Sequence, residues 1–116
     1  MSSSSGEAVK AVQDKIDSTK VLVYEKWGCP FCGRVKDLLE DLALEPEPEF
    51  IELDGHVGAS TQRALMQLTG QRTVPNVFIG GTHVGGCDDT MAAVQSGKLK
   101  ELLDKAGVRS SNLSKM

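Results

Sequence analysis

The sequence predicts one α/β domain with a mixed four-stranded sheet and helices on both faces. Hydrophobic periodicity places the elements in the order helix, strand, helix, strand, helix, two strands, and two final helices. The strand–helix–strand segment favours parallel strands, whereas the two-residue Gly80-Gly81 turn favours an antiparallel pair. The length of 116 residues suits a single domain. With 40% hydrophobic residues and only five aromatic ones, the core is expected to consist mainly of aliphatic side chains.

The first half of the chain predicts two helices around a strand. Helical spacing predicts an amphipathic helix over residues 7–17, and the apolar run 21–24 predicts a central strand. Gly28 then interrupts the pattern. A second helix is predicted over residues 30–44, because apolar residues recur on one face against charged ones, and Pro46 and Pro48 interrupt it. The apolar positions of the two helices are Ala8, Val12, Ile16, Val35, Leu38, Leu39 and Leu42.

The second half predicts a strand, a helix, a hairpin and a helical end. Residues 50–53 form the expected strand, and Ala64, Leu65 and Leu68 mark a helix that Gly70 closes. The hairpin is expected to join the strands 77–79 and 82–84. Asp88 or Asp89 is expected to cap the next helix, and helical spacing continues to Gly107.

Composition and the chain ends restrict the environment and the partners. We expect a disordered Ser-rich tail over residues 1–6, one domain over 7–108 and a mobile polar tail over 109–116. The net charge of −3 argues against nucleic acid, and no apolar stretch approaches the roughly 18 residues of a membrane span. Without an apolar secretory signal, the chain is expected to be cytoplasmic, or organellar if a transit peptide was removed. Three cysteines favour reactive thiols over a disulfide framework.

Cys29 and Cys32 form a C-x-x-C pair where the first strand ends and the most regular helix begins. Free N–H groups and the positive end of the helix dipole favour a thiolate, so Cys29 is predicted to be the nucleophile. Pro30 suits the first helical turn because its missing N–H has no partner there. Cys32 falls on the apolar face with Val35 and is predicted to be the less exposed, resolving thiol.

Charge is unevenly distributed around this pair. Lys26, Arg34 and Lys36 surround it and favour a thiolate at short range. In contrast, the segment 37–54 carries eight acidic residues and no Lys or Arg. We expect it to be a solvated acidic face that could also steer basic clients.

The chain resembles the dithiol glutaredoxins of the thioredoxin fold, and most closely their plant and algal members. The resemblance spans roughly residues 20–107. It rests on Lys26-x-x-Cys29-Pro30-Phe31-Cys32, Leu68-Thr69-Gly70, Thr73-Val74-Pro75 and Gly85-Gly86-Cys87-Asp88-Asp89. Thioredoxins proper carry Gly-Pro between their cysteines, and this chain does not. Phe31 stands where many glutaredoxins have tyrosine, which implies altered tuning with activity retained.

The resemblance implies a glutathione site. Lys26 and Gln62 would hold the glycyl carboxylate, and Val74 would pair its backbone with the tripeptide before a cis Pro75. The γ-glutamyl end would lie at a helix N-terminus, where N–H groups bind anions. The residues implied there are Gly86, Cys87, Asp88 and Asp89, and Phe31 and Thr73 complete the expected glutathione contacts.

The family implies reduction of protein–glutathione mixed disulfides and of protein disulfides, with glutathione as reducing co-substrate and no tightly bound cofactor. Cys29 would attack the mixed disulfide, and Cys32 would complete a dithiol cycle. The expected partners are glutathione and client proteins that carry glutathionylated or disulfide-bonded cysteines. The protein is expected to be a monomer that binds neither nucleic acid nor membrane.

Three other readings of the cysteines remain. Some relatives bridge a [2Fe–2S] cluster between two subunits through the first cysteine and glutathione, and by family analogy Pro30 argues against that carrier function. A zinc site of Cys29, Cys32, His83 and Cys87 is disfavoured because the two halves lie far apart in sequence. An interaction adaptor would need no thiol chemistry. Cys87 is interpreted as a turn residue or a glutathione neighbour, His56 as a surface or turn residue, and Arg63 and Arg72 as solvated charges or additional glutathione contacts.

Overall fold

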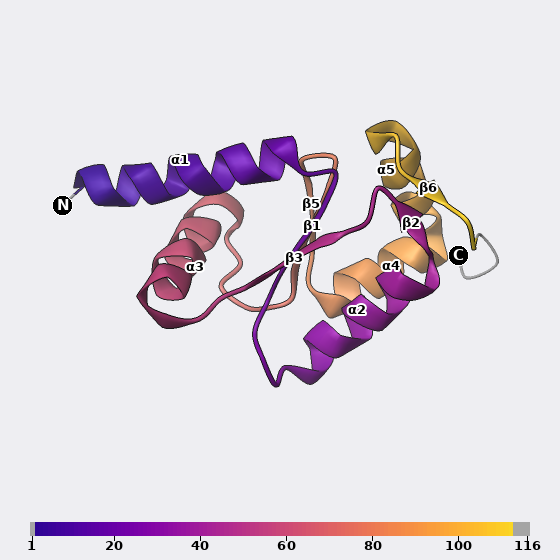
Figure 1. Ribbon diagram of the computed structural model, residues 1–116, viewed down its shortest axis with the longest axis horizontal. Coiled ribbons are helices and arrows are strands. Elements are labelled where there is room, and N and C mark those ends of the chain that lie inside the picture. Colours follow the sequence, from indigo (N-terminus) through magenta and orange to yellow (C-terminus); the bar gives the residue numbers. More distant parts are fainter. Residues whose placement is uncertain (1, 113–116) are drawn as a thin grey trace.

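The structure is a computed structural model that describes residues 2–112, with side chains described from Gly6 onward. Figure 1 shows a central sheet with helices on both sides. The elements are α1 (Ser2–Ser18), β1 (Val21–Glu25), α2 (Pro30–Asp41), β2 (Leu44–Glu45), β3 (Glu49–Glu52), α3 (Gly55–Thr69), β4 (Asn76–Ile79), β5 (Thr82–Gly85), α4 (Cys87–Ser96), α5 (Lys98–Ala106) and β6 (Arg109–Ser110).

The main sheet confirms the predicted mixed topology. Its four strands lie in the order β3-β1-β4-β5. Strand β1 pairs with β3 in parallel and with β4 antiparallel, and β4 pairs with β5 antiparallel. The last pair is the predicted hairpin, and its Gly80 and Gly81 have φ values of 58° and 82°. Both residues of a tight type I′ turn need positive φ, which explains the Gly-Gly sequence.

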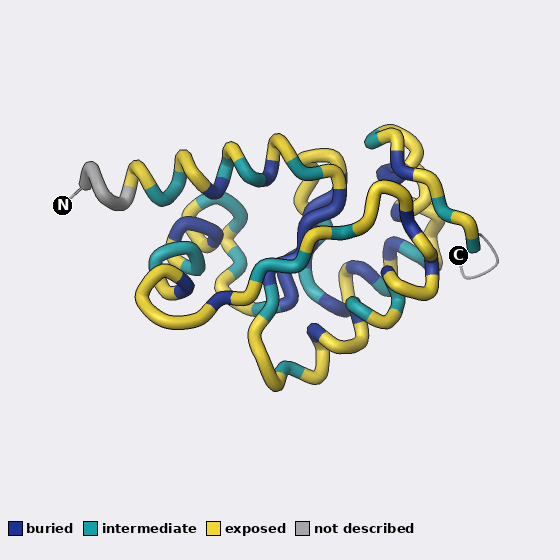
Figure 2. The backbone as a smooth tube through the Cα atoms, viewed as in Figure 1, coloured by how far each residue is buried: buried dark blue, intermediate teal, exposed yellow. Residues whose placement is uncertain are grey.

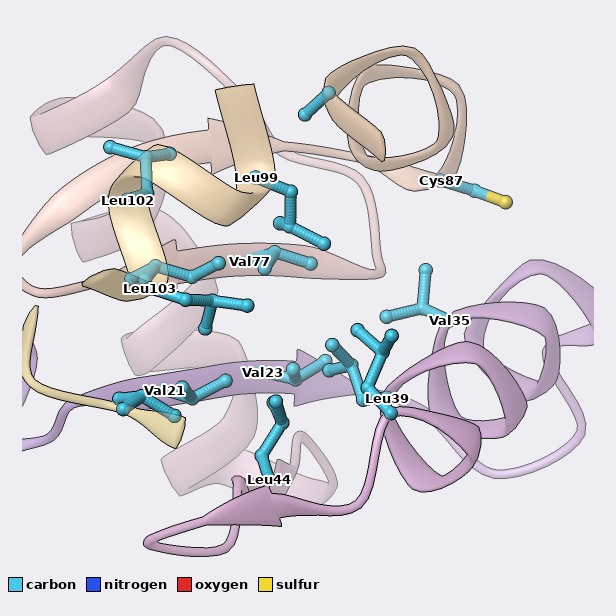
Figure 3. Packing of buried hydrophobic residues seen from close by; sticks show 14 residues of the cluster. Val21, Val23, Val35, Leu39, Leu44, Val77, Cys87, Leu99, Leu102 and Leu103 are labelled. Atoms are coloured by element: carbon cyan, nitrogen blue, oxygen red, sulfur yellow. The ribbon is translucent and has the colours of Figure 1, made fainter. Parts of the chain in front are cut away.

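Two hydrophobic clusters cover the two faces of this sheet. Val21 and Val23 of β1 point into a cluster formed with α2, α4 and α5 (Figure 3). Leu22 and Tyr24 point to the opposite face, where they pack with α1, α3 and Phe78. This alternation is the period-two pattern of a strand buried on both sides. Figure 2 shows the central strands as the most deeply buried part of the chain.

Two helix boundaries differ from the sequence prediction. Helix α1 begins at Ser2 instead of residue 7, so it extends into the segment predicted as a disordered tail, and serine is well suited to helix starts. Helix α2 ends at Asp41 instead of residue 44, because Ala43 has a φ of 49° and Leu44 turns into a strand. Periodicity locates helix ends poorly, and the Ser-rich composition of residues 1–6 does not by itself exclude a helix.

The sequence predicts a mobile tail over residues 109–116, but residues 109–112 are bound to the domain. Strand β6 pairs antiparallel with β2, which joins Leu44 to Ser110 and Glu45 to Arg109. The Ser110 hydroxyl donates a hydrogen bond to the carbonyl oxygen of Leu42. Residues 113–116 of the predicted tail, like Met1, lie outside the described residues.

Candidate active site

Cys29 lies between the end of β1 and the start of α2, as the sequence predicts. Its backbone N–H donates to the carbonyl oxygen of Lys26 at 3.3 Å, which closes a turn after the strand. Cys29 is the N-cap of α2, and Pro30 occupies the first turn. The backbone N–H of Cys32 donates to Cys29 Sγ at 3.3 Å. A sulfur that accepts a helix N-terminal N–H is stabilised as a thiolate.

Cys32 is buried, with 3% of its surface exposed, and lies near Val35 on the inner face of α2. Burial raises the pKa of the Cys32 thiol to about 12, and the side-chain hydrogen bond between the Cys32 and Cys29 thiols also raises it. The thiol of Cys32 therefore stays protonated in this state, while Cys29 is only half-buried. The predicted difference in exposure between the two sulfurs is confirmed.

A loop between α3 and β4 lies against Cys29. The Val74–Pro75 peptide bond is cis, as the resemblance implied. The Cys29 thiol lies 3.9 Å from the carbonyl oxygen of Val74, within the range of a weak sulfur hydrogen bond. The side chain of Pro75 is buried and that of Val74 half-buried. Residues far apart in sequence are thus brought together at the start of α2.

Gln71 organises this loop and is not among the site residues predicted from the sequence. Its side-chain Nε2 donates to the carbonyl oxygens of Thr73 and Pro75, at 3.0 Å each. These two carbonyls flank Val74, so Gln71 holds the backbone on both sides of that residue. A polar side chain that bonds a nearby loop is common, and the sequence offers no signal that separates Gln71 from a solvated glutamine.

Gly86 meets the same loop from the start of α4. A Cβ atom at Gly86 would lie 3.6 Å from the Pro75 carbonyl oxygen and 3.8 Å from Gln71 Nε2. Gly86 is also the N-cap of α4, and its N–H donates to the Asp89 carboxylate at 3.0 Å. The predicted cap at Asp88 or Asp89 is therefore wrong. Asp89 lies in the first turn and bonds backward to the cap, as the third residue of a capping box does.

Cys87 begins α4, and its side chain is 6% exposed. The side chain belongs to the core cluster that also contains Val35 (Figure 3). Asp88, the next residue, is exposed. The backbone at this helix start thus faces the Pro75 loop while the Cys87 side chain contributes to packing.

The remaining predicted glutathione residues lie at the periphery. Lys26 is exposed, and Phe31 is 52% exposed with the Arg34 guanidinium 5.6 Å from its ring centre. Gln62 donates through Nε2 to the carbonyl oxygen of Arg72. A hollow of about 440 Å³ opens beside that contact, lined by Ala59, Gln62, Arg63, Met66 and Arg72.

The residues of the alternative zinc site are used differently. His83 Nε2 lies 2.8 Å from Asn76 Oδ1, and burial lowers the pKa of His83 below its usual value. Within residues 6–112, no three His, Cys, Asp or Glu side chains are placed to hold a metal ion.

The acidic segment 37–54 is partly paired with cations. Glu49 forms an ion pair with Lys15, and Glu45 forms one with Arg109.

Comparisons with known proteins identify the family. The Glutaredoxin family model matches residues 21–84. Glutaredoxin-C6 of Oryza sativa subsp. japonica is 50% identical over 106 residues, which cover 90% of this chain and 93% of that protein. The chloroplastic Glutaredoxin-C4 of the same species is 46% identical over 100 residues, covering 86% of this chain and 74% of that protein. The crystal structure of a buckwheat glutaredoxin–glutathione complex superposes with a TM-score of 0.86 at 40% identity, covering 95% of this chain and 99% of that one. The chain therefore belongs to the glutaredoxin family.

Proposed function

We propose that Cys29 and Cys32 carry out the glutathione-dependent thiol–disulfide chemistry of this glutaredoxin. Membership in the family makes the chain a thiol–disulfide oxidoreductase that uses glutathione. The observation that supports these residue roles is the hydrogen bond from the Cys32 backbone N–H to Cys29 Sγ at the start of α2. It stabilises negative charge on one sulfur, while burial keeps the other one protonated.

On a protein–glutathione mixed disulfide, the Cys29 thiolate attacks the glutathione sulfur. A new disulfide forms between Cys29 and glutathione, the original S–S bond breaks, and the client leaves as a thiolate that takes up a proton. A second glutathione thiolate then attacks the glutathione sulfur bound to Cys29. Glutathione disulfide is released and the Cys29 thiolate is regenerated. This deglutathionylation cycle needs no other oxidant or reductant and no tightly bound cofactor.

Protein disulfides require the second thiol. Cys29 forms a mixed disulfide with the client, and Cys32 attacks the Cys29 sulfur to release the client as a dithiol. The Cys29–Cys32 disulfide that results is reduced by two glutathione molecules. Glutathione and client proteins are thus the proposed partners of a monomeric enzyme.

Glutathione is proposed to lie across the loop and the start of α4. A buckwheat relative forms a glutathione complex, and that relative has the same fold. Val74 is proposed to pair its backbone with the tripeptide, with Thr73 and Pro75 beside it. The N–H groups of Cys87 and Asp88 at the start of α4 suit the γ-glutamyl carboxylate, because the Gly86 N–H already donates to Asp89. The exposed carboxylate of Asp88 suits the amino group of that end. The opposite carboxylate is proposed to bind Lys26 and Gln62, with Phe31 beside the sulfur.

The enzyme is proposed to act in the cytoplasm or an organelle. No helix within residues 2–112 is long and apolar enough to cross a membrane. Two of the relatives are named as chloroplastic, so an organellar location is proposed as an alternative to the cytoplasmic one. Imaging of the tagged full-length chain in cells distinguishes the two.

A glutathione-coupled reductase assay tests the residue roles. Wild type, Cys29→Ser and Cys32→Ser are compared on a glutathionylated peptide and on a peptide disulfide. Cys29→Ser should lose turnover on both substrates. Cys32→Ser should keep turnover on the glutathionylated peptide and lose the direct dithiol reduction of the disulfide. Activity of Cys29→Ser at the wild-type rate would refute the proposal.

A further inference from the structure

Two exposed aromatic side chains bracket Cys29 along the chain. Trp27 is 89% exposed and precedes the cysteine by two residues, and Phe31 is 52% exposed and follows it by two. Two peptide units span at most about 7.6 Å between Cα atoms, so both residues lie close to the reactive sulfur. The other exposed large hydrophobics among the described residues are Val57 and Met66, on α3.

The turn geometry explains why Trp27 projects outward. Lys26 and Cys29 are the ends of a β-turn closed by the 3.3 Å backbone hydrogen bond, so Trp27 and Gly28 are its central residues. Gly28 has a φ of 78°, the value that a type II turn needs at its third position. A Cβ added to Gly28 would meet nothing within 4 Å, so backbone conformation rather than space favours glycine here. Trp27 consequently occupies the tip of the turn that presents Cys29.

Two cationic side chains lie near this turn. Lys26 is exposed beside Trp27, and the Arg34 guanidinium lies 5.6 Å from the Phe31 ring centre. Tryptophan and arginine are the residues that most often dominate binding energy at protein interfaces. A patch with one free indole and nearby cations complements a polypeptide that offers an apolar side chain and no excess of positive charge.

We propose that Trp27 is a client-recognition residue that contacts an apolar side chain next to the client's disulfide-bonded cysteine. The inference rests on the proposed function, because the client half of the mixed disulfide must lie beside Cys29 when the bond breaks. Glutathione is proposed to contact Val74, Lys26 and Phe31, but Trp27 is not among its contacts, so the exposed indole is available to the client half. Trp27 thus selects among protein substrates and contributes little to small ones.

Glutathionylated peptides of equal length test this selectivity. They differ only in the residue beside the cysteine, which is leucine, serine or lysine, and the mixed disulfide of glutathione with cysteamine serves as the small substrate. Wild type should prefer the leucine peptide to the serine peptide by about tenfold in kcat/KM, with the lysine peptide the poorest. Trp27→Ala should remove that preference and keep the cysteamine rate within about twofold. Trp27→Phe should restore part of the preference.

Val57→Ala is the matched control, because Val57 is also an exposed apolar residue, at 80%, but lies on α3. It should keep the wild-type preference. The sequence contains a single tryptophan, so fluorescence gives a second readout. For this readout, the cysteine of the peptide carries an activated aryl disulfide, so the aryl thiol leaves and the peptide stays bound to Cys29 of Cys32→Ser. The emission should shift to the blue when the neighbouring residue is leucine, and less when it is serine.

The outcomes separate this inference from the proposed function. If wild type fails to turn over the cysteamine disulfide, the proposed function is wrong. If it turns over that substrate but Trp27→Ala keeps the leucine preference, the role of Trp27 is wrong. An equal loss on all substrates, including cysteamine, also overturns client recognition, because Trp27 would then act on the glutathione step or on folding.

Discussion

Replacing Gln71 with alanine removes the two hydrogen bonds that hold the loop beside Cys29. Each of these 3.0 Å bonds ends on a backbone carbonyl, one part-buried and one exposed. A typical hydrogen bond contributes about 1 kcal/mol, and the exposed one less, so the variant should lose about 1–2 kcal/mol of the free energy that holds the loop in place. The carbonyls of Thr73 and Pro75 then lose a shared donor, and the backbone of Val74 between them is no longer held from both sides.

The expected effect is on substrate binding more than on bond breaking. If about 1 kcal/mol of that ordering must be supplied when glutathione binds, KM for a glutathionylated peptide should rise about fivefold. The kcat value should change less, because Cys29 and its N–H donor are untouched. Steady-state kinetics with varied peptide, at fixed glutathione, measure the two constants separately.

Two further variants identify the donor as the cause. Gln71→Glu keeps the size of the side chain but replaces the amide donor with an acceptor, so it should raise KM at least as much as alanine does. Gln67→Ala changes an exposed glutamine on α3 and should leave both constants near wild type. The positioning role would be refuted if the KM of Gln71→Ala equals that of wild type within error. It would also be refuted if kcat falls about fivefold while KM does not change.

Three further predictions concern the fold and the second thiol. Cys32→Ser should retain most of the turnover on a glutathionylated peptide, measured with the coupled assay. In the wild type at neutral pH, iodoacetamide should label the buried Cys32 much more slowly than the half-buried Cys29, because burial raises the pKa of Cys32 to about 12. Burial also raises the pKa of Tyr24 to about 12. The stability that this group contributes is therefore fully present below about pH 10 and is lost as the pH rises through 12. Phenolate absorbance of the single tyrosine measures the titration midpoint, and a midpoint near pH 10 would contradict the burial. Gly58→Ala should lower the free energy of unfolding by about 3 kcal/mol, because the added Cβ would lie 2.6 Å from the backbone of Leu53. Gly33→Ala on α2 has open space around its Cβ and should raise the free energy of unfolding by about 0.5–1 kcal/mol. Urea titrations measure both changes.

The local parts of the fold could be predicted because each one carries its own signal. The Gly80-Gly81 hairpin follows from two residues that accept positive φ, and it appears as predicted. The nucleophile's position follows from proline after Cys29 and the apolar stripe behind Cys32. These signals lie within one or two helical turns of the residues that they describe, so no tertiary information is needed to interpret them.

The missed parts depend either on a contact between distant segments or on local backbone geometry that side-chain type does not specify. Leu44 forms a strand because it pairs with Ser110, which is far away in the sequence, and no residue near Leu44 predicts that pairing. Gln71 matters because the backbone after it bends so that two carbonyls converge on one amide. Side-chain type alone does not reveal such convergence. The same limit explains the wrong prediction for the cap of α4. Gly86 is the N-cap, and the Asp89 carboxylate in the first turn accepts a hydrogen bond from its N–H.

The geometry of α2 also orders the two thiol steps. Burial is the largest cause of the raised pKa of Cys32, followed by its hydrogen bond with Cys29, while the Lys26 backbone acts in the opposite direction. A mixed disulfide on Cys29 removes the Cys29 contributions that raise the pKa of Cys32, whereas burial and the Lys26 backbone contact remain. We therefore expect Cys32 to become a better nucleophile once Cys29 has reacted, in competition with glutathione attack on the same mixed disulfide.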